Sequence, residues 1–212
     1  MTNSDGSNES DIAVYLGLGS NVKDREANIR EAIARIEKLG LAVARESSIY
    51  ETEPVGLADQ PWFLNQVIET RILAGLTSEQ GPVLGDPEAI ATVRAEALLF
   101  ELLKIEHEMG RARTITNGPR VIDIDLLLFG DEIIGDLIEE KQRLSIDRTE
   151  IILPHPRMHQ RRFVLKPLCE IVPELVHPVL KQTCREMLAS LDDDSRVRIY
   201  RQRSLFFGRL SC

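Results

Sequence analysis

The segment Val121–Leu126 limits the possible folds of this chain more than any other, because it places two carboxylates in an otherwise apolar run. Asp123 and Asp125 alternate there with valine, isoleucine and leucine, a pattern typical of a buried β-strand. Residues two apart on a strand point to the same side, so the two carboxylates project together, with Cβ atoms about 6 to 7 Å apart. A buried carboxylate without compensation is energetically costly. We therefore expect a cationic partner, and a divalent metal ion is the leading candidate.

Three arginines, Arg111, Arg113 and Arg120, precede this run. Guanidinium groups bind phosphate oxygens in a bidentate fork, and Mg²⁺ is usually held by one or two carboxylates together with substrate phosphates. Two carboxylates can also share a pair of Mg²⁺ ions, as in many phosphoryl-transfer sites. The segment therefore predicts a nucleotide triphosphate site without a P-loop. The alternative is a structural salt-bridge network between Arg120 and the aspartates. Two aspartates beside three arginines favour the metal.

The length, net charge and cysteine content of the sequence restrict the class of protein to which it can belong. A chain of 212 residues is most simply one domain with appendages, and a net charge of -8 disfavours a general polyanion binder. Residues 1–11 are polar and lack the apolar stretch of a signal peptide, so we expect a disordered tail before a single domain at 12–212. No apolar run reaches transmembrane length. Three scattered cysteines favour a reduced, cytoplasmic protein. We expect neither a nucleic-acid nor a membrane partner.

Hydrophobic periodicity predicts a mixture of strands and helices. Besides the Asp123 run, strands are expected over Ile12–Leu18, Leu41–Tyr50 and Trp62–Glu69. Amphipathic helices are expected over Asn28–Leu39 and Ile90–Met109. Surface insertions are expected near 75–90 and 136–150, where no apolar period continues. Towards the C-terminus, Leu180–Leu191 could form a final helix and Arg196–Arg209 a docked strand or tail.

Phe63 and Asn65 share one face of the strand expected at Trp62–Glu69. An aromatic ring beside an amide could hold a flat heterocycle, with the ring stacking and the amide pairing with the edge of the heterocycle. The alternative is that Phe63 belongs to the core and Asn65 caps a turn. The residues alone favour that alternative.

The segment Leu153–Phe163 carries two histidines and three arginines. His155 and His159 have a spacing seen in zinc sites, but Pro156 opposes a helix that presents both, and no third ligand is evident. A basic loop that contacts phosphate is the better interpretation. Glu106 lies in the last turn of an expected helix, where an acid is not favoured by the helix dipole. It is either a solvated charge or a contact for what the following loop binds.

Four motifs occur in order between residues 12 and 178. They are Gly17-x-Gly19-Ser20-Asn21; Ser48-x-Tyr50-x-Thr52-x-Pro54-x-Gly56 with Asp59-Gln60-Pro61-x-Phe63-Leu64-Asn65; Gly118-Pro119-Arg120-x-x-Asp123-x-Asp125-Leu126; and Pro154-His155-Pro156-Arg157-Met158 with Arg161-x-Phe163. Together they resemble the signature of the 6-hydroxymethyl-7,8-dihydropterin pyrophosphokinase family, which acts in folate biosynthesis.

This resemblance implies a ferredoxin-like α+β sandwich, with a mainly antiparallel sheet and helices packed on it. It implies transfer of a diphosphate group from ATP to the hydroxymethyl oxygen of the pterin, with release of AMP. By similarity, Asp123 and Asp125 hold two Mg²⁺ ions, and Arg111 and Arg120 act with them in catalysis. The implied ATP-binding residues are Glu106, Arg111, Arg113, Arg120, His155 and Arg161. The implied pterin-binding residues are Gly19, Thr52, Val55, Phe63, Asn65 and Phe163, with the two phenylalanines on either side of the ring.

The sequence departs from the family pattern at Thr116-Asn117, where the family often has an arginine and an aromatic residue. The segment Arg111–Asn117 corresponds to a mobile lid in the family, so lid contacts are expected to differ here.

The chain has no room for a fused second enzyme, and we expect a monomer with a single activity. A two-metal phosphohydrolase is the alternative enzyme, and a ferredoxin-like RNA-binding domain is the non-enzymatic alternative. The latter lacks its basic, aromatic sheet motif and is opposed by the acidic charge.

Overall fold

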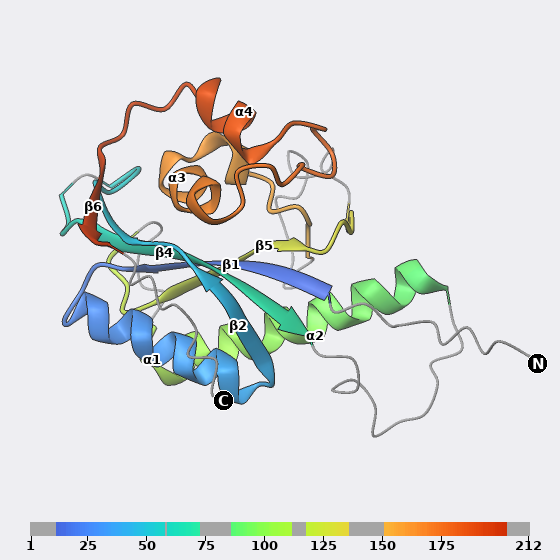
Figure 1. Ribbon diagram of the computed structural model, residues 1–212. Helices are drawn as coiled ribbons and strands as arrows, with labels where there is room; N and C mark the ends of the chain where they lie inside the picture. Colours follow the sequence, from blue (N-terminus) through green and yellow to red (C-terminus); the bar gives the residue numbers. More distant parts are fainter. Residues whose placement is uncertain (1–11, 58, 73–85, 112–117, 136–150, 203–212) are drawn as a thin grey trace, which may run out of the picture.

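The computed structural model describes residues 12–57, 59–72, 86–111, 118–135 and 151–202 (Figure 1). Its elements are β1 (Ile12–Ser20), α1 (Arg25–Lys38), β2 (Leu41–Glu46), β3 (Ile49–Thr52), β4 (Phe63–Ile72), α2 (Pro87–Glu108), β5 (Asp123–Phe129), the short 3-10 helix η2 (Met158–Gln160), α3 (Arg162–Ile171), α4 (Cys184–Ala189) and β6 (Val197–Arg201). Among the described residues, none of these helices is long and apolar enough to cross a membrane.

The strands form one antiparallel sheet. Its order is β5-β1-β4-β3-β6, and β2 also pairs with β4. β1 occupies one edge of β4, while β2 and β3 follow one another along the other edge. The path β1–α1–β2–β4–α2–β5, with the spatial order β5-β1-β4-β2, is that of a ferredoxin-like fold. The predicted fold class is therefore confirmed.

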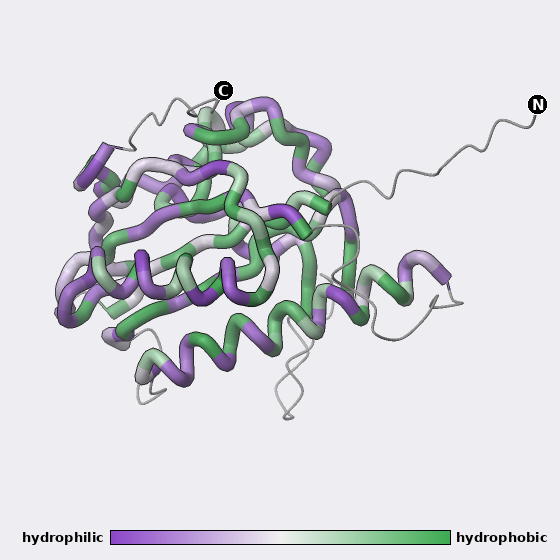
Figure 2. Tube along the Cα trace, turned by 60° about the horizontal axis from the view of Figure 1, so that its bottom comes forward, coloured by the Kyte–Doolittle hydropathy of each residue, from purple (hydrophilic) through white to green (hydrophobic). Residues whose placement is uncertain are grey.

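Helices cover both faces of the sheet, so that the domain has three layers (Figure 1). α1 and α2 pack on one face through a core that includes Ile29, Ile36 and Leu102. Figure 2 brings these two helices forward and shows hydrophobic and hydrophilic residues mixed along both, as expected of helices with one buried side. α3 and α4 pack on the opposite face, where Leu165 and Leu168 belong to a second core.

Helix starts differ from the prediction because two aspartates act as N-caps. α1 begins at Arg25 rather than Asn28, since Asp24 Oδ1 accepts a hydrogen bond from the Ala27 N–H at 3.0 Å. α2 begins at Pro87, and the Asp86 carboxylate accepts from the Glu88 N–H. Proline is favoured in the first turn of a helix, where its missing N–H is not needed. The last four residues of the segment predicted as an insertion near 75–90 are thus helical.

The prediction of a single strand over Leu41–Tyr50 is wrong in one respect. Ser47 and Ser48 divide this segment into β2 and β3. The Ser47 hydroxyl accepts from the Val67 N–H at 3.0 Å and so replaces a main-chain partner in the ladder. The Glu170 carboxylate of α3 accepts from the Ser48 N–H and hydroxyl and from the Tyr50 hydroxyl, each at 2.9 Å. The division of the strand therefore anchors α3 to the sheet.

The C-terminal elements are shorter than predicted. The final helix covers only Cys184–Ala189, because Thr183 and Glu186 form a capping box that starts it. The docked strand is β6, and the remainder of Arg196–Arg209 beyond Gln202 lies outside the described residues. The predicted tail at 1–11, the insertion at 136–150 and most of the insertion near 75–90 also lie outside them.

Candidate active site

A cavity of about 490 Å³ opens on the sheet face that α3 shares. α3 and α4 pack on one part of this face through Tyr15, Val67 and Leu127. On β1, the next residues on that face after Tyr15 are Gly17 and Gly19, and both line the cavity. A Cβ atom added to Gly19 would lie 2.8 Å from Asn65 Oδ1, closer than real Cβ contacts allow. The glycines therefore leave the space in which a ligand could lie.

The register of the sheet gathers the two aspartates beside these glycines. Asp123 pairs with Gly19, and Asp125 pairs with Gly17. Asp123 Oδ1 lies 2.6 Å from Arg111 Nη2, and Asp123 Oδ2 lies 2.6 Å from Arg120 Nη1. Both Asp123 oxygens are thus paired, as the salt-bridge alternative requires.

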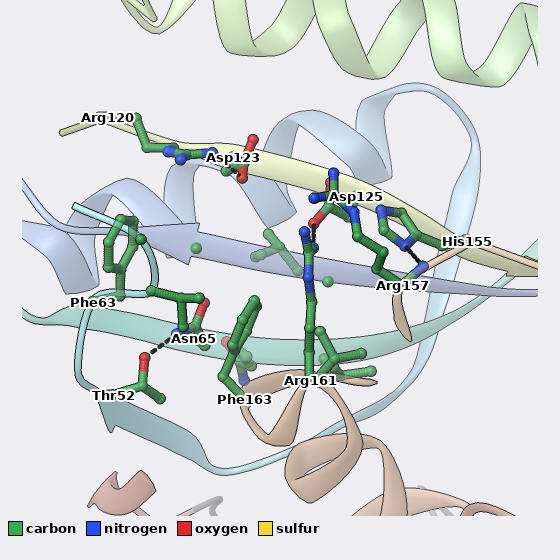
Figure 3. A pocket seen from close by; sticks show the side chains of 18 of the residues that line it. Thr52, Phe63, Asn65, Arg120, Asp123, Asp125, His155, Arg157, Arg161 and Phe163 are labelled. Atoms are coloured by element: carbon green, nitrogen blue, oxygen red, sulfur yellow. Dashed lines mark hydrogen bonds and ion pairs between the residues drawn. The ribbon is translucent and has the colours of Figure 1, made fainter. Parts of the chain in front are cut away.

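Asp125 is compensated less well than Asp123. Within the described part of the chain its ion pair is with Arg161, at an N–O distance of 3.8 Å, longer than a hydrogen bond (Figure 3). Burial and the neighbouring Asp123 carboxylate raise the pKa of Asp125. An additional cation would lower it again. Of the two carboxylates, Asp125 is therefore the one whose oxygens can still bind a further cation.

Glu106 lies behind the aspartates rather than in the cavity. Its side chain is 3% exposed. Glu106 Oε1 accepts from the Ile124 N–H at 2.6 Å, and Oε2 pairs with Arg111. Burial raises the pKa of Glu106 to about 7, although the Ile124 N–H and Arg111 oppose that shift. The carboxylate holds the strand at the residue between the two aspartates and orients one of the arginines.

The basic loop predicted to touch phosphate faces the cavity from the side of η2. His155, Arg157 and Arg161 all line it (Figure 3). The His155 N–H donates to Leu127 O at 2.9 Å, which fixes the loop on β5. Burial, with Arg161 and Arg157 nearby, lowers the pKa of His155 to about 4, so the ring is neutral at pH 7. Its Nδ1 accepts from the Arg157 N–H at 3.2 Å, which leaves the proton on Nε2, free to donate.

The other end of the cavity is aromatic. Figure 3 shows Phe63 and Phe163 on different elements, with Asn65 between them. Asn65 Nδ2 donates to Thr52 Oγ1 at 2.7 Å, which fixes the orientation of the amide. The Arg120 guanidinium lies 5.7 Å from the Phe63 ring centroid, and that of Arg161 lies 5.5 Å from the Phe163 centroid. Each of these two arginines therefore contacts a phenyl ring at the aromatic end and an aspartate at the charged end of the cavity.

The structure gathers most of the predicted site residues around this one cavity. Those that line it are Gly19, Thr52, Val55, Phe63, Asn65, Arg111, Arg120, Asp123, Asp125, His155, Arg161 and Phe163. Glu106 contacts the site from behind, and Arg113 lies outside the described residues.

The lining also contains residues to which the sequence assigned no site role. They are Gly17, Leu18, Glu53, Gly56, Gln66, Val67, Arg157, Gln160 and Val164. Arg157 carried a signal, because it stands in the basic loop between two assigned residues. Glu53 carried none, because a charged residue in an aperiodic loop is usually solvated.

Comparison with known proteins agrees with this geometry. The family model of 7,8-dihydro-6-hydroxymethylpterin-pyrophosphokinase (HPPK) matches residues 15–80 and 88–173. A Bacillus subtilis protein named 2-amino-4-hydroxy-6-hydroxymethyldihydropteridine pyrophosphokinase is 35% identical over 195 residues, which cover 90% of this chain and 91% of the relative.

Some relatives are much longer. Folic acid synthesis protein fol1 of Pneumocystis carinii is 37% identical over 167 residues, which cover 79% of this chain but 18% of the fol1 chain. A crystal structure of HPPK-DHPS in complex with substrates shares the fold, with a TM-score of 0.54 at 17% identity, over 85% of this chain and 43% of the other. The extent of the family match and the identity to a relative of similar length lead to one conclusion: the chain belongs to the HPPK family.

Proposed function

We propose that this chain transfers a diphosphate group from ATP to the hydroxymethyl group of 6-hydroxymethyl-7,8-dihydropterin in folate biosynthesis, releasing AMP. Membership of the HPPK family supports the reaction. The observation that carries its assignment to this site is that one cavity is lined both by carboxylates with arginines and by two phenyl rings with an amide. Such a cavity offers places for a polyphosphate and a flat heterocycle side by side.

The charged end of the cavity fits the triphosphate. Arg111, Arg120 and Arg161 present guanidinium groups there, and Arg157 adds a fourth. One guanidinium group can bind two phosphate oxygens at the same time. Neutral His155 can donate from Nε2 to a phosphate oxygen without adding charge. Arg113 belongs to the same set by resemblance. Glu106, which the resemblance assigns to the ATP site, also orients it, because its oxygens accept from Ile124 and Arg111.

The aromatic end of the cavity fits the pterin. Phe63 and Phe163 would stack on the two sides of the ring, and Asn65 would pair with its edge. Asn65 Nδ2 donates to Thr52, and the amide oxygen would accept from donors on the edge of the ring. Gly19 keeps the backbone close to the ring, and Val55 closes the edge.

Asp123 and Asp125 are the residues that would hold Mg²⁺, and two ions are proposed. Among the residues that the structure describes, no three His, Cys, Asp or Glu side chains gather into a metal-binding group. A pair of carboxylates still fits, because Mg²⁺ commonly takes one or two carboxylates and completes its shell with phosphates and water. The poor compensation of Asp125 supports the same assignment. When bound, Mg²⁺ supplies neutralisation of phosphate charge.

Catalysis in this proposal needs no nucleophilic side chain. The oxygen of the pterin hydroxyl forms a bond to the β-phosphorus of ATP and its proton is released to water, while the bond from that phosphorus to the oxygen bridging the α-phosphate breaks and its electron pair leaves with AMP. The arginines align the triphosphate, and the phenyl rings align the hydroxyl. Positioning of this kind and stabilisation of developing charge are the main sources of rate in phosphoryl transfer.

The test is to incubate the purified protein with ATP, Mg²⁺ and 6-hydroxymethyl-7,8-dihydropterin and to identify the products by phosphorus NMR. Equal amounts of AMP and pterin diphosphate are expected. Orthophosphate or free diphosphate would instead identify a phosphohydrolase and refute the proposal. We also propose a cytoplasmic monomer, which light scattering of the purified protein and fractionation of cells would test.

A further inference from the structure

Strand β6 adds an element to the pterin end of the cavity. It follows residue 173, where the match to the family model ends. It pairs with the outer edge of β3, with Thr52 opposite Val197 and Tyr50 opposite Ile199. Figure 1 shows β6 at this edge of the sheet. β3 carries Thr52, the hydrogen-bond partner of Asn65, so β6 lies directly behind one wall of the cavity.

Arg196, just before β6, holds Glu53 through three hydrogen bonds. The Arg196 N–H donates to Glu53 Oε1 at 2.8 Å, and Arg196 Nε donates to Glu53 Oε2 at 2.8 Å. The Glu53 N–H donates to Arg196 O at 3.2 Å. The Arg196 N–H, and then its side chain, lower the pKa of Glu53, so the carboxylate is ionised at neutral pH.

Glu53 follows Thr52 and Trp62 precedes Phe63, and both Thr52 and Phe63 line the cavity. Glu53, Val55 and Gly56 line the cavity. The Arg196 guanidinium also lies 4.9 Å from the Trp62 ring centroid, within the range of a cation–π contact. One side chain therefore contacts both ends of the loop that runs from Glu53 to Trp62.

We propose that Arg196 is a positioning residue for pterin binding: it ties Glu53 to Trp62 and so fixes the wall formed by Glu53, Val55 and Gly56. The inference rests on the proposed function, since it names the ligand of that end of the cavity. This wall contains none of the arginines or aspartates assigned to ATP. The contribution of Arg196 therefore falls on the pterin and not on ATP.

Arg198 supplies a matched control from the same strand. Its guanidinium lies 5.0 Å from the same Trp62 centroid and 2.6 Å from Glu51 Oε2. The two arginine side chains are similarly exposed, 74% for Arg196 and 69% for Arg198. Glu51 is not among the residues that line the cavity, whereas Glu53 is. Both arginines contact Trp62, but only the Arg196 substitution removes a side-chain contact to a residue that lines the cavity.

The experiment measures pterin and ATP binding by calorimetry, together with steady-state KM values, for the wild type, Arg196→Ala, Arg196→Lys and Arg198→Ala. Arg196→Ala should raise the Kd and KM for the pterin about fivefold, the size expected for loss of one exposed ion-paired hydrogen bond and a cation–π contact, since the main-chain bonds to Glu53 remain. The KM for ATP should change less than twofold. Arg196→Lys, which keeps the charge, should recover part of the loss, and Arg198→Ala, which keeps the Arg196–Glu53 contact, should lose clearly less pterin affinity than Arg196→Ala.

Two results would overturn the positioning role. One is that Arg196→Ala weakens pterin and ATP binding by the same factor or leaves both unchanged. The other is that Arg198→Ala weakens pterin binding as much as Arg196→Ala does. Failure of the proposed function looks different, since the wild-type protein itself would then release no AMP.

Discussion

Replacing Gly19 with alanine should weaken pterin binding selectively. Gly19 lies in the extended backbone of β1, where alanine is tolerated, so the effect is steric. The new Cβ would lie 2.8 Å from Asn65 Oδ1, and the amide would have to move by roughly half an ångström to restore a normal contact. That shift opposes the 2.7 Å hydrogen bond from Asn65 to Thr52.

Loss of well-aligned hydrogen bonding by the amide should cost about 1 to 2 kcal/mol. At about 1.4 kcal/mol per tenfold change, the Kd for the pterin should rise roughly tenfold. Titration calorimetry with pterin and with ATP separately would measure the effect, and the Kd for ATP should stay within about twofold of the wild type, because the arginines do not move.

Gly17→Ala is the matched comparison, because it makes the same substitution two residues away on the same face. Its Cβ would lie 3.5 Å from Leu127 Cδ1, an ordinary van der Waals contact. Its effect on pterin binding should therefore be clearly smaller. If the two variants lose pterin affinity equally, or if Gly19→Ala binds the pterin as well as the wild type does, the assignment of Asn65 and Gly19 to the pterin is wrong.

Three further outcomes test the site. Asp125→Ala should nearly abolish turnover, because it removes a proposed Mg²⁺ ligand, while circular dichroism shows a folded protein; normal turnover would contradict the metal assignment. Phe163→Ala should raise the Kd for the pterin far more than that for ATP, and equal losses in calorimetry would exclude the stacking role. The pKa of Glu106 is raised by burial from 4.5 to about 7, so the folded protein binds this proton more tightly than the unfolded chain. The contribution of Glu106 to stability is therefore lost as pH rises from about 4.5 to 7. Glu106→Gln, which can still accept from Ile124, should flatten urea-melt stability over that window; an unchanged pH dependence would refute the shift.

The local pattern was sufficient to predict several parts of the molecule. Asp123 and Asp125 alternate with core residues, and that period of two predicts their common face, because it follows from strand geometry alone. The apolar stripe of α2 likewise predicts which side of that helix is buried. The motif resemblance added the antiparallel order of the sheet, which no single segment could specify.

Long-range contacts explain what the sequence did not predict. The sequence left Glu106 as either a solvated charge or a contact for what the following loop binds, whereas its partner Ile124 is a main-chain group on a strand 18 residues away. Ser47 divides a strand because its hydroxyl bonds to Val67, a residue on another strand. Arg196 meets Glu53 across 143 residues. Each of these contacts depends on chain segments that only the folded sheet brings together.

The bond from Ile124 to Glu106 has a consequence for the solubility of the protein. In the part of the chain that the structure describes, β5 pairs only with β1, so its outer side is a sheet edge. Main-chain donors on such an edge can recruit a strand from another molecule and start aggregation. The buried carboxylate occupies one of these donors from within. Variants that cannot accept this bond would leave the Ile124 N–H without its partner at that edge, and they should aggregate on heating more readily than the wild type.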